Sequence, residues 1–390
     1  MKGKILHIAP TPFFSDRGCH IRIEGIVNCL RELGFSNTVC TYHHGREVDR
    51  IDTVRIKTIK NYTQTEAGPS RYKLWADWKL LWVCVGQAWR EKPVAIHAHL
   101  HEGLLIAQLV CLILFWRTVP IIGDMQGSLE GELDSHGSFK RFGIIRKPVK
   151  WIEQALMVTA DYIICSSSHC LEKIKSEFEI PDRKTSLVQD GAKLATPVSK
   201  VESDLLREKL AIPPEKTIVI YTGALLDSKG VGKLRAVIKR CANYPELHFL
   251  VVGYPTENMI PFIDKYNLRD HCTLTGQVEF SVLSQYLSIA DIAIDPKQSG
   301  AGEGSGKMLN YMASGLPIAA FETSNNRQFL PTGTLLAATT AELADLVKAL
   351  HESRPLRNQG GQANLEHFIE HYSWKTTKSQ IDAVYRKLLG

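Results

Sequence analysis

Short apolar runs of strand length alternate with segments of helical period along most of the chain. Runs that are apolar on both faces are typical of parallel strands covered by helices on either side. In the first half the expected strands are residues 5–9, 38–42, 94–98, 119–123, 162–165 and 186–188. In the second half they are residues 218–222, 248–252, 273–275, 292–295 and 318–321. The pattern predicts an α/β protein with two doubly wound parallel sheets, each in a Rossmann-like domain.

A polar stretch that contains Pro197, Pro213 and Pro214 separates the two series of strands. A stretch of this composition is typical of a link between domains. A chain of 390 residues is also longer than one hydrophobic core normally covers. We therefore expect a first domain over 1–192, a linker with a short helix over 193–214, a second domain over 215–371 and a closing helix over 372–390.

One of the helical segments, residues 71–89, is unusually rich in tryptophan. Its apolar residues form a broad stripe at helical spacing: Leu74, Trp75, Trp78, Leu81, Trp82 and Val85. Such a stripe more often faces the core than a ligand. We expect it to be buried against the first sheet.

Composition and charge exclude several classes of protein. Hydrophobic residues make up 44% and charged residues 23%, which is ordinary globular usage. The longest apolar run, residues 103–116, is shorter than the roughly 20 residues that a membrane-spanning helix needs. The first ten residues, MKGKILHIAP, lack the pattern of a signal peptide, so a cytoplasmic location is expected. A net charge of +6 without a basic repeat does not indicate a nucleic-acid partner, whereas anionic small molecules or an anionic membrane surface stay open.

The nine cysteines show neither a paired framework nor a Cys-x-x-Cys spacing. We expect reduced, mostly buried thiols and no metal site formed by cysteine.

Two glycine-containing segments are candidates for binding phosphate. The loop after the first strand lacks Gly-x-Gly-x-x-Gly, which disfavours a nicotinamide dehydrogenase. Residues 300–307 resemble a P-loop, but Met308 stands where that motif needs Ser or Thr. These residues do lead into a predicted helix over 307–314, and the N–H groups at a helix start favour an anion. We favour a ligand there over a tight connection without one.

The second candidate is residues 223–230, directly after the first strand of the second half. Lys229 could meet the same phosphates from this loop. The alternative is a solvated lysine before a helix.

These segments carry a resemblance to the family 4 glycosyltransferases of the GT-B fold, and it covers nearly the whole chain. The strongest match is ADIAIDPKQSGAGEGSGKMLNYMASGLPIAAF at 290–321, which is similar to the family's strand, glycine- and glutamate-containing loop and helix. YTGALLDSKGVGKL at 221–234 resembles the family's Gly-Arg-Leu and Lys-Gly elements. Further matches are residues 16–18, HAHLHEG at 97–103 and residues 276–278. The closing YSWKTTKSQIDAVYRKLL resembles the helix that crosses back to the first domain, and the resemblance implies two domains facing a cleft.

The resemblance implies transfer of a sugar, with retention of configuration, from a nucleoside diphosphate sugar to an acceptor. It implies no required metal or cofactor. The catalytic candidates are Lys229 at the diphosphate, Glu303 at the donor sugar and Gln126. The donor-binding candidates are Gly18, Gly223, Val278, Gly304, Ser305, Gly306, Lys307 and Asn310. The acceptor-side candidates are Arg17, His99, His101 and Asp124.

The sequence departs from the family pattern at three of its positions. Ala224 stands where a phosphate-binding arginine is common, Gln126 where a histidine is common, and Asn310 where a glutamate binds ribose. Both amides can still donate and accept hydrogen bonds. Ala224 cannot replace a guanidinium, and Lys297, Lys307 and Arg327 stay open as compensating cations.

Histidines alternate with other residues at 97, 99 and 101, as metal ligands can at the end of a strand. No further ligand follows at a suitable spacing. The family resemblance places His99 and His101 at the rim of the cleft and makes Asp124 an acceptor contact, with His97 buried.

The predicted function is hexose transfer to a glycan or lipid-linked acceptor in cell-envelope polysaccharide biosynthesis. Two alternatives are a catalytically silent nucleotide-sugar-binding scaffold and a nucleotide-sugar epimerase on the same fold. Cations beside apolar residues over 139–151 allow peripheral contact with the inner face of an anionic membrane, and a solvated helix entrance explains them equally well.

Overall fold

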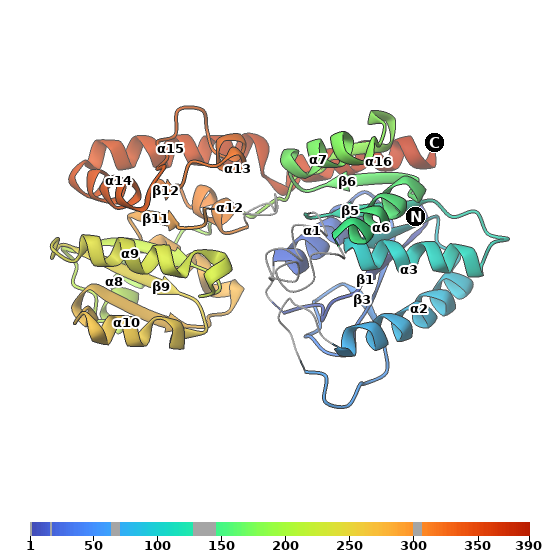
Figure 1. Ribbon diagram of the computed structural model, residues 1–390, viewed down its shortest axis with the longest axis horizontal. Helices are drawn as coiled ribbons and strands as arrows, with labels where there is room; N and C mark the ends of the chain where they lie inside the picture. Colours follow the sequence, from blue (N-terminus) through green and yellow to red (C-terminus); the bar gives the residue numbers. More distant parts are fainter. Residues whose placement is uncertain (1, 16–17, 64–70, 128–145, 299–305) are drawn as a thin grey trace. The chain divides into compact units, whose positions relative to one another are not determined.

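The computed structural model describes the chain except for residues 1, 16–17, 64–70, 128–145 and 299–305 (Figure 1). The chain divides into two compact units. The described residues of Met1–Gly191 and of Trp374–Gly390 form the first unit, and those between them form the second. Each unit is built on one parallel sheet.

The first unit contains a seven-stranded parallel sheet with the order β3-β2-β1-β4-β5-β6-β7. The strands are β1 (Lys4–Ala9), β2 (Ser36–Thr41), β3 (Asp52–Arg55), β4 (Ala95–His99), β5 (Ile121–Met125), β6 (Tyr162–Cys165) and β7 (Thr185–Leu187). All six strands predicted for this half are present within two residues at each end. The sequence did not predict β3, whose four residues, DTVR, are only half-buried or exposed at the edge of the sheet.

Helices cover both faces of this sheet. They are α1 (Gly18–Glu32), α2 (Arg71–Glu91), α3 (Leu100–Ile113), α6 (Arg146–Thr159), α7 (Ser168–Phe178) and α16 (Trp374–Leu389). Apolar residues of α2, α3, α6 and α7 pack against one face of the sheet. Those of α1 and α16 pack against the other. The unit is therefore a doubly wound α/β layer structure, as predicted.

Helix α16 returns the end of the chain to the first unit, where it packs beside α1. Trp374 occupies the space that a side chain on α1 would otherwise take, since a Cβ on Gly25 would lie 1.8 Å from its ring. Near the other end of the helix, the Tyr385 hydroxyl lies 2.9 Å from Nδ1 of His97 on β4. The predicted crossing of the closing helix is confirmed.

The second unit contains a five-stranded parallel sheet with the order β10-β9-β8-β11-β12. The strands are β8 (Thr217–Thr222), β9 (Leu247–Val252), β10 (Cys272–Gly276), β11 (Ile292–Asp295) and β12 (Ile318–Ala320). The helices are α8 (Lys200–Lys209), α9 (Val231–Cys241), α10 (Ile260–Lys265), α11 (Leu283–Ser288), α12 (Gly306–Ala313), α13 (Ser324–Phe329), α14 (Thr340–Glu352) and α15 (Arg354–His371). Residues of α9, α10 and α14 cover one face. Residues of α11, α12 and α15 cover the other.

The segment 193–214, expected to link the domains, contains α8. A capping box formed by Ser199 and Glu202 begins this helix. Leu206, Leu210 and the buried Ile212 pack against the apolar cluster under α12. The segment is thus packed on the second unit along much of its length.

Most of the tryptophan-rich stripe on α2 does not face the core. The prediction was wrong for Leu74 and the three tryptophans, while Leu81 is buried and Val85 packs partly against the core. The buried face of α2 is formed by smaller residues, among them Ala76, Leu80 and Cys84. Trp75 is 53% exposed, and Trp78 and Trp82 are each 51% exposed. Both faces of this helix are apolar, and the sheet takes the face with the smaller side chains.

All nine cysteines lie in the described ranges as free thiols, and seven of them are buried, which confirms that most are buried. Among the helices of the described ranges, none is both long enough and apolar enough to span a bilayer.

Candidate functional site

The order of strands in the second unit reverses direction between β8 and β11. From β8 the chain builds outward through β9 and β10, and it then returns to add β11 and β12 on the other side. In open α/β sheets the loops at such a reversal diverge, and ligands bind in the crevice at the carboxyl ends of the strands. The loops after β8 and β11 are therefore where a ligand is expected.

The loop after β8 is tightly constrained. Gly223 has a φ of 129°, and a Cβ on the neighbouring Gly253 would lie 1.9 Å from its carbonyl oxygen. The Tyr221 hydroxyl donates a hydrogen bond of 2.9 Å to the carbonyl of Ala224. A single 3-10 turn over Asp227–Lys229 then leads into α9.

The backbone beside Lys229 touches the loop that follows β11. Gly230 has a φ of 87°, and a Cβ there would lie 2.3 Å from the carbonyl oxygen of Pro296. Only glycine allows so close an approach at this backbone conformation. The turn that carries Lys229 is therefore held against the first residue beyond β11.

Lys307, in the first turn of α12, reaches the last residue of β11. Its Nζ lies 2.6 Å from Oδ1 of Asp295, whose side chain is 3% exposed. The same ammonium group lies 4.8 Å from the centre of the Tyr221 ring. Lys307 thus ties the start of α12 to both β8 and β11.

A second bond fixes the same helix one turn later. The Tyr311 hydroxyl accepts a hydrogen bond of 2.8 Å from the backbone N–H of Thr222, the last residue of β8. Gly306, the first residue of α12, is exposed, and no described atom lies within 4 Å of where its Cβ would be. The N–H groups at the start of α12 thus lie at the carboxyl ends of β8 and β11, beside open space.

The structure brings together several of the predicted donor residues. The turn that carries Lys229 is held beside Pro296 through Gly230, Lys307 is bonded to Asp295, and Asn310 lies half-buried on α12. Val278 follows β10 and packs partly against the core cluster beneath α12. Glu303, Gly304 and Ser305 lie outside the described residues.

The three cations that could compensate for Ala224 differ in their surroundings. Lys307 is paired with Asp295, and Arg327 forms a surface ion pair of 2.7 Å with Glu322. Lys297 is half-buried in the loop after β11, and its backbone N–H donates to Asp295. Lys297 and Lys307 therefore lie at the same strand end, whereas Arg327 lies on α13 and is paired with Glu322, just before that helix.

Replacing Gly230 by alanine is expected to weaken the site. The new Cβ would collide with the carbonyl of Pro296, and the positive φ adds strain of about 1–3 kcal/mol. The loops after β8 and β11 must then separate. We expect a measurable loss of stability in urea unfolding and at least a tenfold loss of affinity for nucleoside diphosphate in calorimetry.

The matched control is Gly232→Ala, two residues later on α9. A Cβ there meets nothing closer than 3.9 Å, so stability should stay within about 1 kcal/mol of the unaltered protein. Equal behaviour of the two variants would contradict the role given to Gly230.

In the first unit, His99 and Asp124 lie in the interior. The prediction that His99 lines a cleft rim was therefore wrong, and Asp124, expected to contact the acceptor, is instead bonded within the protein. Both side chains are fully buried. Arg22 of α1 donates to both carboxylate oxygens of Asp124, at 2.7–3.1 Å. His99 Nδ1 lies 2.8 Å from the same carboxylate. Arg22 also bonds Asp190 beyond β7 and so completes a buried ion network.

The network continues through the histidines of β1 and β4. Nε2 of His99 lies 3.1 Å from Nδ1 of His7, which bonds Asn37 of β2 through its other nitrogen. Burial, together with the neighbouring His99, lowers the pKa of His7 to about 3. Burial alone would raise the pKa of Asp124, but Arg22 and His99 hold it well below its usual range. The network thus contains a fixed carboxylate and arginine with a neutral His7.

The atoms of His97, His99 and Asp124 that could bind a metal lie within 4.8 Å of one another. Arg22 already neutralises the carboxylate, and His99 uses both ring nitrogens on Asp124 and His7. This donor set is therefore a structural ion network. His97 is buried as predicted, and its Nδ1 bonds Tyr385.

The other predicted site residues of the first unit do not belong to this ion network. His101 is 5% exposed and bonds the buried Glu153 of α6, so it too does not line a rim. Gln126 follows β5, and its buried Nε2 has no partner among the described residues. Gly18 is the exposed first residue of α1. Arg17 lies outside the described residues.

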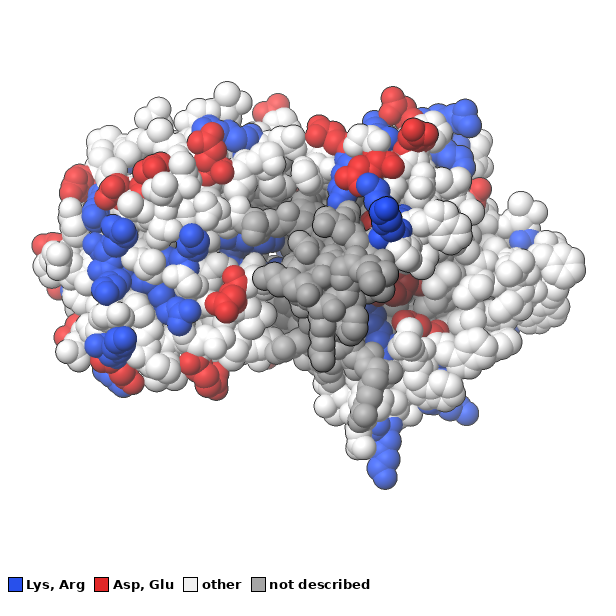
Figure 2. Space-filling view, viewed as in Figure 1, with Lys and Arg blue, Asp and Glu red and all other residues white. Residues whose placement is uncertain are grey.

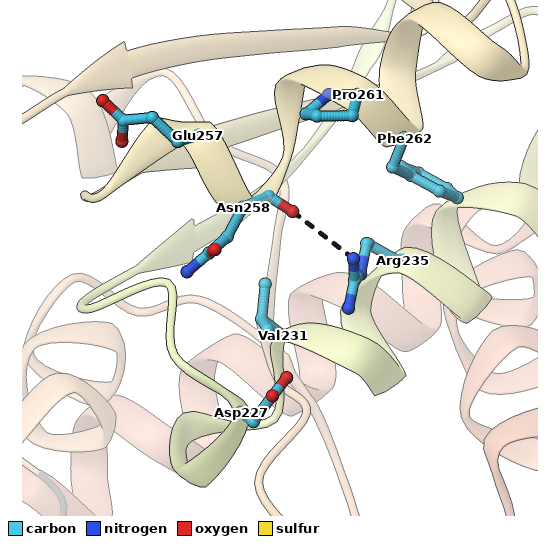
Figure 3. Close-up of a pocket in the computed structure, with 7 residues that line it drawn as sticks. All are labelled: Asp227, Val231, Arg235, Glu257, Asn258, Pro261 and Phe262. Atoms are coloured by element: carbon cyan, nitrogen blue, oxygen red, sulfur yellow. Dashed lines mark hydrogen bonds between the residues drawn. The ribbon is translucent and has the colours of Figure 1, made fainter.

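A small hollow lies between α9 and the segment that leads into α10 (Figure 3). It has a volume of about 210 Å³, and Arg235 crosses it with a hydrogen bond of 3.5 Å to the carbonyl of Asn258. Asp227 contributes to its wall, but Lys229, Lys307 and Gly306 do not. The hollow is therefore separate from the candidate site.

Comparison with known families agrees with this geometry. Residues 202–367 match the family described as "Glycosyl transferases group 1". Residues 17–191 match the "Glycosyl transferase 4-like domain". The chain belongs to the glycosyltransferases that these two families describe. The predicted family and enzyme class are confirmed.

One similar protein is "Sulfoquinovosyl transferase SQD2" of Arabidopsis thaliana, 23% identical over 96% of this chain and 72% of that protein. Among solved structures, sucrose-phosphate synthase from Thermosynechococcus elongatus superposes with a TM-score of 0.81 at 18% identity, covering 99% of this chain and 98% of that one. Anabaena HepE in complex with UDP-glucose superposes with a TM-score of 0.78 at 15% identity, covering 98% of this chain and 99% of that one. These likenesses show that the two parallel-sheet units have the GT-B fold.

Proposed function

We propose that this glycosyltransferase moves a hexose from a nucleoside diphosphate sugar to a glycan or lipid-linked acceptor, with retention of configuration. The observation that carries the proposal is the meeting of three elements at the β8–β11 reversal. These are the Lys229–Gly230 turn, the end of β11 and the start of α12. Together they bring the turn that carries Lys229 and the N–H groups at the start of α12 to the same end of the sheet.

This arrangement suits the charge that develops in the reaction. When the sugar leaves, negative charge accumulates on the phosphate oxygens of the departing nucleoside diphosphate. Groups that are fixed where that charge develops lower the barrier. Lys229 would neutralise the diphosphate from one side, and the N–H groups of α12 would face it from the other. Because the protein supplies these groups, the proposed reaction needs no metal or other cofactor.

The remaining roles follow from position and chemistry. Asn310 would bond a ribose hydroxyl from α12, Val278 would meet the base through its backbone, and Glu303 would contact sugar hydroxyls. In the first unit, Gln126 offers an unpaired amide at the end of β5 for a donor-sugar hydroxyl. Gly18 begins α1 and would approach the phosphates.

UDP-glucose is the first donor to test, because the similar HepE was solved with that molecule. We place the reaction in the cytoplasm, at the inner face of the membrane, in polysaccharide biosynthesis for the cell envelope. This setting fits a lipid-linked acceptor made from cytoplasmic nucleotide sugars.

The test is a panel of nucleotide sugars in which binding is measured by calorimetry and release of the nucleoside diphosphate by a coupled assay. Binding with release that depends on an acceptor supports the proposal, and NMR of the product reports the anomeric configuration. Binding without release, with every acceptor, would favour a silent scaffold. Conversion of one donor into another without acceptor would favour an epimerase, and absence of binding across the panel would contradict all three.

A further inference from the structure

Two neighbouring helices of the first unit present large aromatic and aliphatic side chains to solvent. We call this surface the tryptophan face; its residues are Trp75, Trp78, Trp82 and Trp89 of α2, with Leu105, Leu112, Phe115 and Trp116 on and just after α3. The four α2 tryptophans are each about half exposed, and Leu112 and Phe115 are 70% and 77% exposed. Figure 2 shows the area over α2 and α3 as largely uncharged. Large apolar patches on a folded protein mark interaction surfaces.

The exposed side chains form one continuous surface. Helices α2 and α3 pack side by side. The rings of Trp89 and Trp116 meet edge to face across the two helices, with their centres 5.8 Å apart. Trp78 and Trp82 are in the same arrangement along α2, also at 5.8 Å. Because of these contacts, the exposed hydrophobic side chains are not scattered single residues.

Helix α6 extends the tryptophan face on the far side of α3. It packs against α3, and its Trp151 is 70% exposed beside the exposed Ile152 and Val158. The membrane contact that the sequence allowed over 139–151 lies partly outside the described residues. Its described part adjoins a larger apolar surface, of which Trp75, Trp78 and Trp82 were expected in the core.

The charges on these three helices have an uneven distribution. Each of their carboxylates has a partner within the protein: Asp77 with Tyr42, Glu91 with Lys4, Glu102 with Lys73 and Glu153 with His101. Of the cations of α2, Lys73 is half-buried in its pair with Glu102, whereas Arg90 is exposed.

Two cations border the tryptophan rings directly, Lys79 on α2 and Arg117 just beyond α3. Lys79 lies 5.8 Å from the Trp75 ring centre, and the Arg117 guanidinium lies 4.8 Å from that of Trp89. Arg90 is exposed at the end of α2. The tryptophan face therefore combines apolar area with positive charge and offers no unpaired carboxylate of these helices.

We propose that the tryptophan face docks on the surface of a lipid bilayer that contains anionic headgroups. Tryptophan suits the boundary between headgroups and acyl chains, because its ring is apolar and its indole N–H is polar. Leu112 and Phe115 would enter the acyl boundary, while Lys79, Arg90 and Arg117 would meet anionic headgroups. A second copy of this chain is a less suitable partner for the tryptophan face, because a twofold contact would bring these cations close together. This inference deepens the proposed function, on whose location at the membrane it rests, and it holds for any donor.

The experiment uses the full chain and two kinds of vesicle, one of phosphatidylcholine alone and one containing about a quarter phosphatidylglycerol. At low salt we expect the protein to sediment with the anionic vesicles and far less with the neutral ones. Tryptophan emission should shift to shorter wavelength on binding. Failure to sediment with anionic vesicles, or equal binding to both kinds, would overturn the proposal.

Substitutions on the tryptophan face test whether it is the surface that binds the vesicles. The triple variant Trp78→Ser, Trp82→Ser, Leu112→Ser should lower the partition coefficient at least tenfold. Its matched control is Val201→Ser, Leu335→Ser, Ile369→Ser, which removes three similarly exposed apolar residues from the second unit and should have no effect. Equal binding by the two triple variants would overturn the proposal.

A charge variant does not depend on how well the apolar variant folds. Lys79→Gln and Arg90→Gln should each lower binding to anionic vesicles about fivefold. No loss in either would contradict the assigned surface. A dimer in solution that only the tryptophan variants dissociate would favour a second copy and overturn the proposal.

Donor binding measured without vesicles separates this inference from the proposed function. The tryptophan variants should bind the nucleotide sugar with unchanged affinity. Loss of vesicle binding with intact donor binding therefore reports on the tryptophan face alone.

Discussion

The Lys229→Ala variant is expected to lose about a hundredfold to a thousandfold in kcat/KM for the nucleotide sugar, equivalent to about 3–4 kcal/mol of transition-state stabilisation. The lysine is carried by a turn that the Gly230 contact holds against Pro296, so its position is fixed before the donor arrives. A group that is already in place stabilises developing charge without reorganising. Steady-state kinetics with the best donor of the panel measures the loss, and circular dichroism checks folding.

The matched control is Lys233→Ala, one turn later on α9, where the side chain is exposed. It removes the same charge from a nearby position on α9, away from the β8–β11 reversal. We expect kcat/KM within about twofold of the unaltered enzyme, as for ordinary surface substitutions. Equal losses in the two variants would show a general effect of charge, and unchanged turnover in a folded Lys229→Ala would remove the proposed role.

The Arg22→Ala variant is expected to lower the free energy of unfolding by about 3–5 kcal/mol. Arg22 is 1% exposed and is the cation that neutralises the fully buried Asp124. Its removal leaves that carboxylate uncompensated in the interior, and it also removes the bond to the carbonyl of Val188. Urea unfolding at neutral pH measures the change.

Two further variants show whether the loss comes from the buried charge. Arg31→Ala, at an exposed position on the same helix, should change stability by no more than about 0.5 kcal/mol. Asp124→Asn combined with Arg22→Met should recover part of the loss, because it removes both charges together. A loss below about 1 kcal/mol in Arg22→Ala would contradict the importance of the network.

The strands could be predicted because each is a short run of residues buried on both faces. Tyr162–Cys165 and Ile292–Asp295 were predicted at their observed bounds. Strand β3 was not, because its pattern DTVR is half polar and it lies at an edge with a single neighbouring strand. Periodicity reports burial, and an edge strand is only partly buried.

Helix α2 shows a second limit of prediction from hydrophobic periodicity. Its apolar residues occupy both faces, with Leu80 and Cys84 on one and Trp78 and Trp82 on the other. The spacing establishes a helix but not which face meets the sheet. The answer depends on the space available above the sheet, and that space is set by residues distant in the sequence.

The two units differ in how much of their polar chemistry the sequence could reveal. In the second unit, Asp295, Lys307 and Tyr311 lie within the one continuous segment that carries the resemblance, and Lys307 was predicted there as a donor-binding residue. In the first, Arg22 and Asp124 are 102 residues apart. The one local sign was an arginine beside Ile23 and Ile26 on an otherwise apolar helix face. Without its distant partner, Asp124 was assigned to the acceptor.

Helix α16 also has a consequence for the order in which the protein forms during synthesis. Ile381 and Tyr385 complete the apolar layer over Ile5 and Ile122, although the whole second unit lies between them in the chain. The second unit has all its own strands and helices available before α16 emerges from the ribosome. The amino-terminal sheet must therefore wait with one side incompletely covered, which exposes it to chaperones and aggregation while the later unit can already fold.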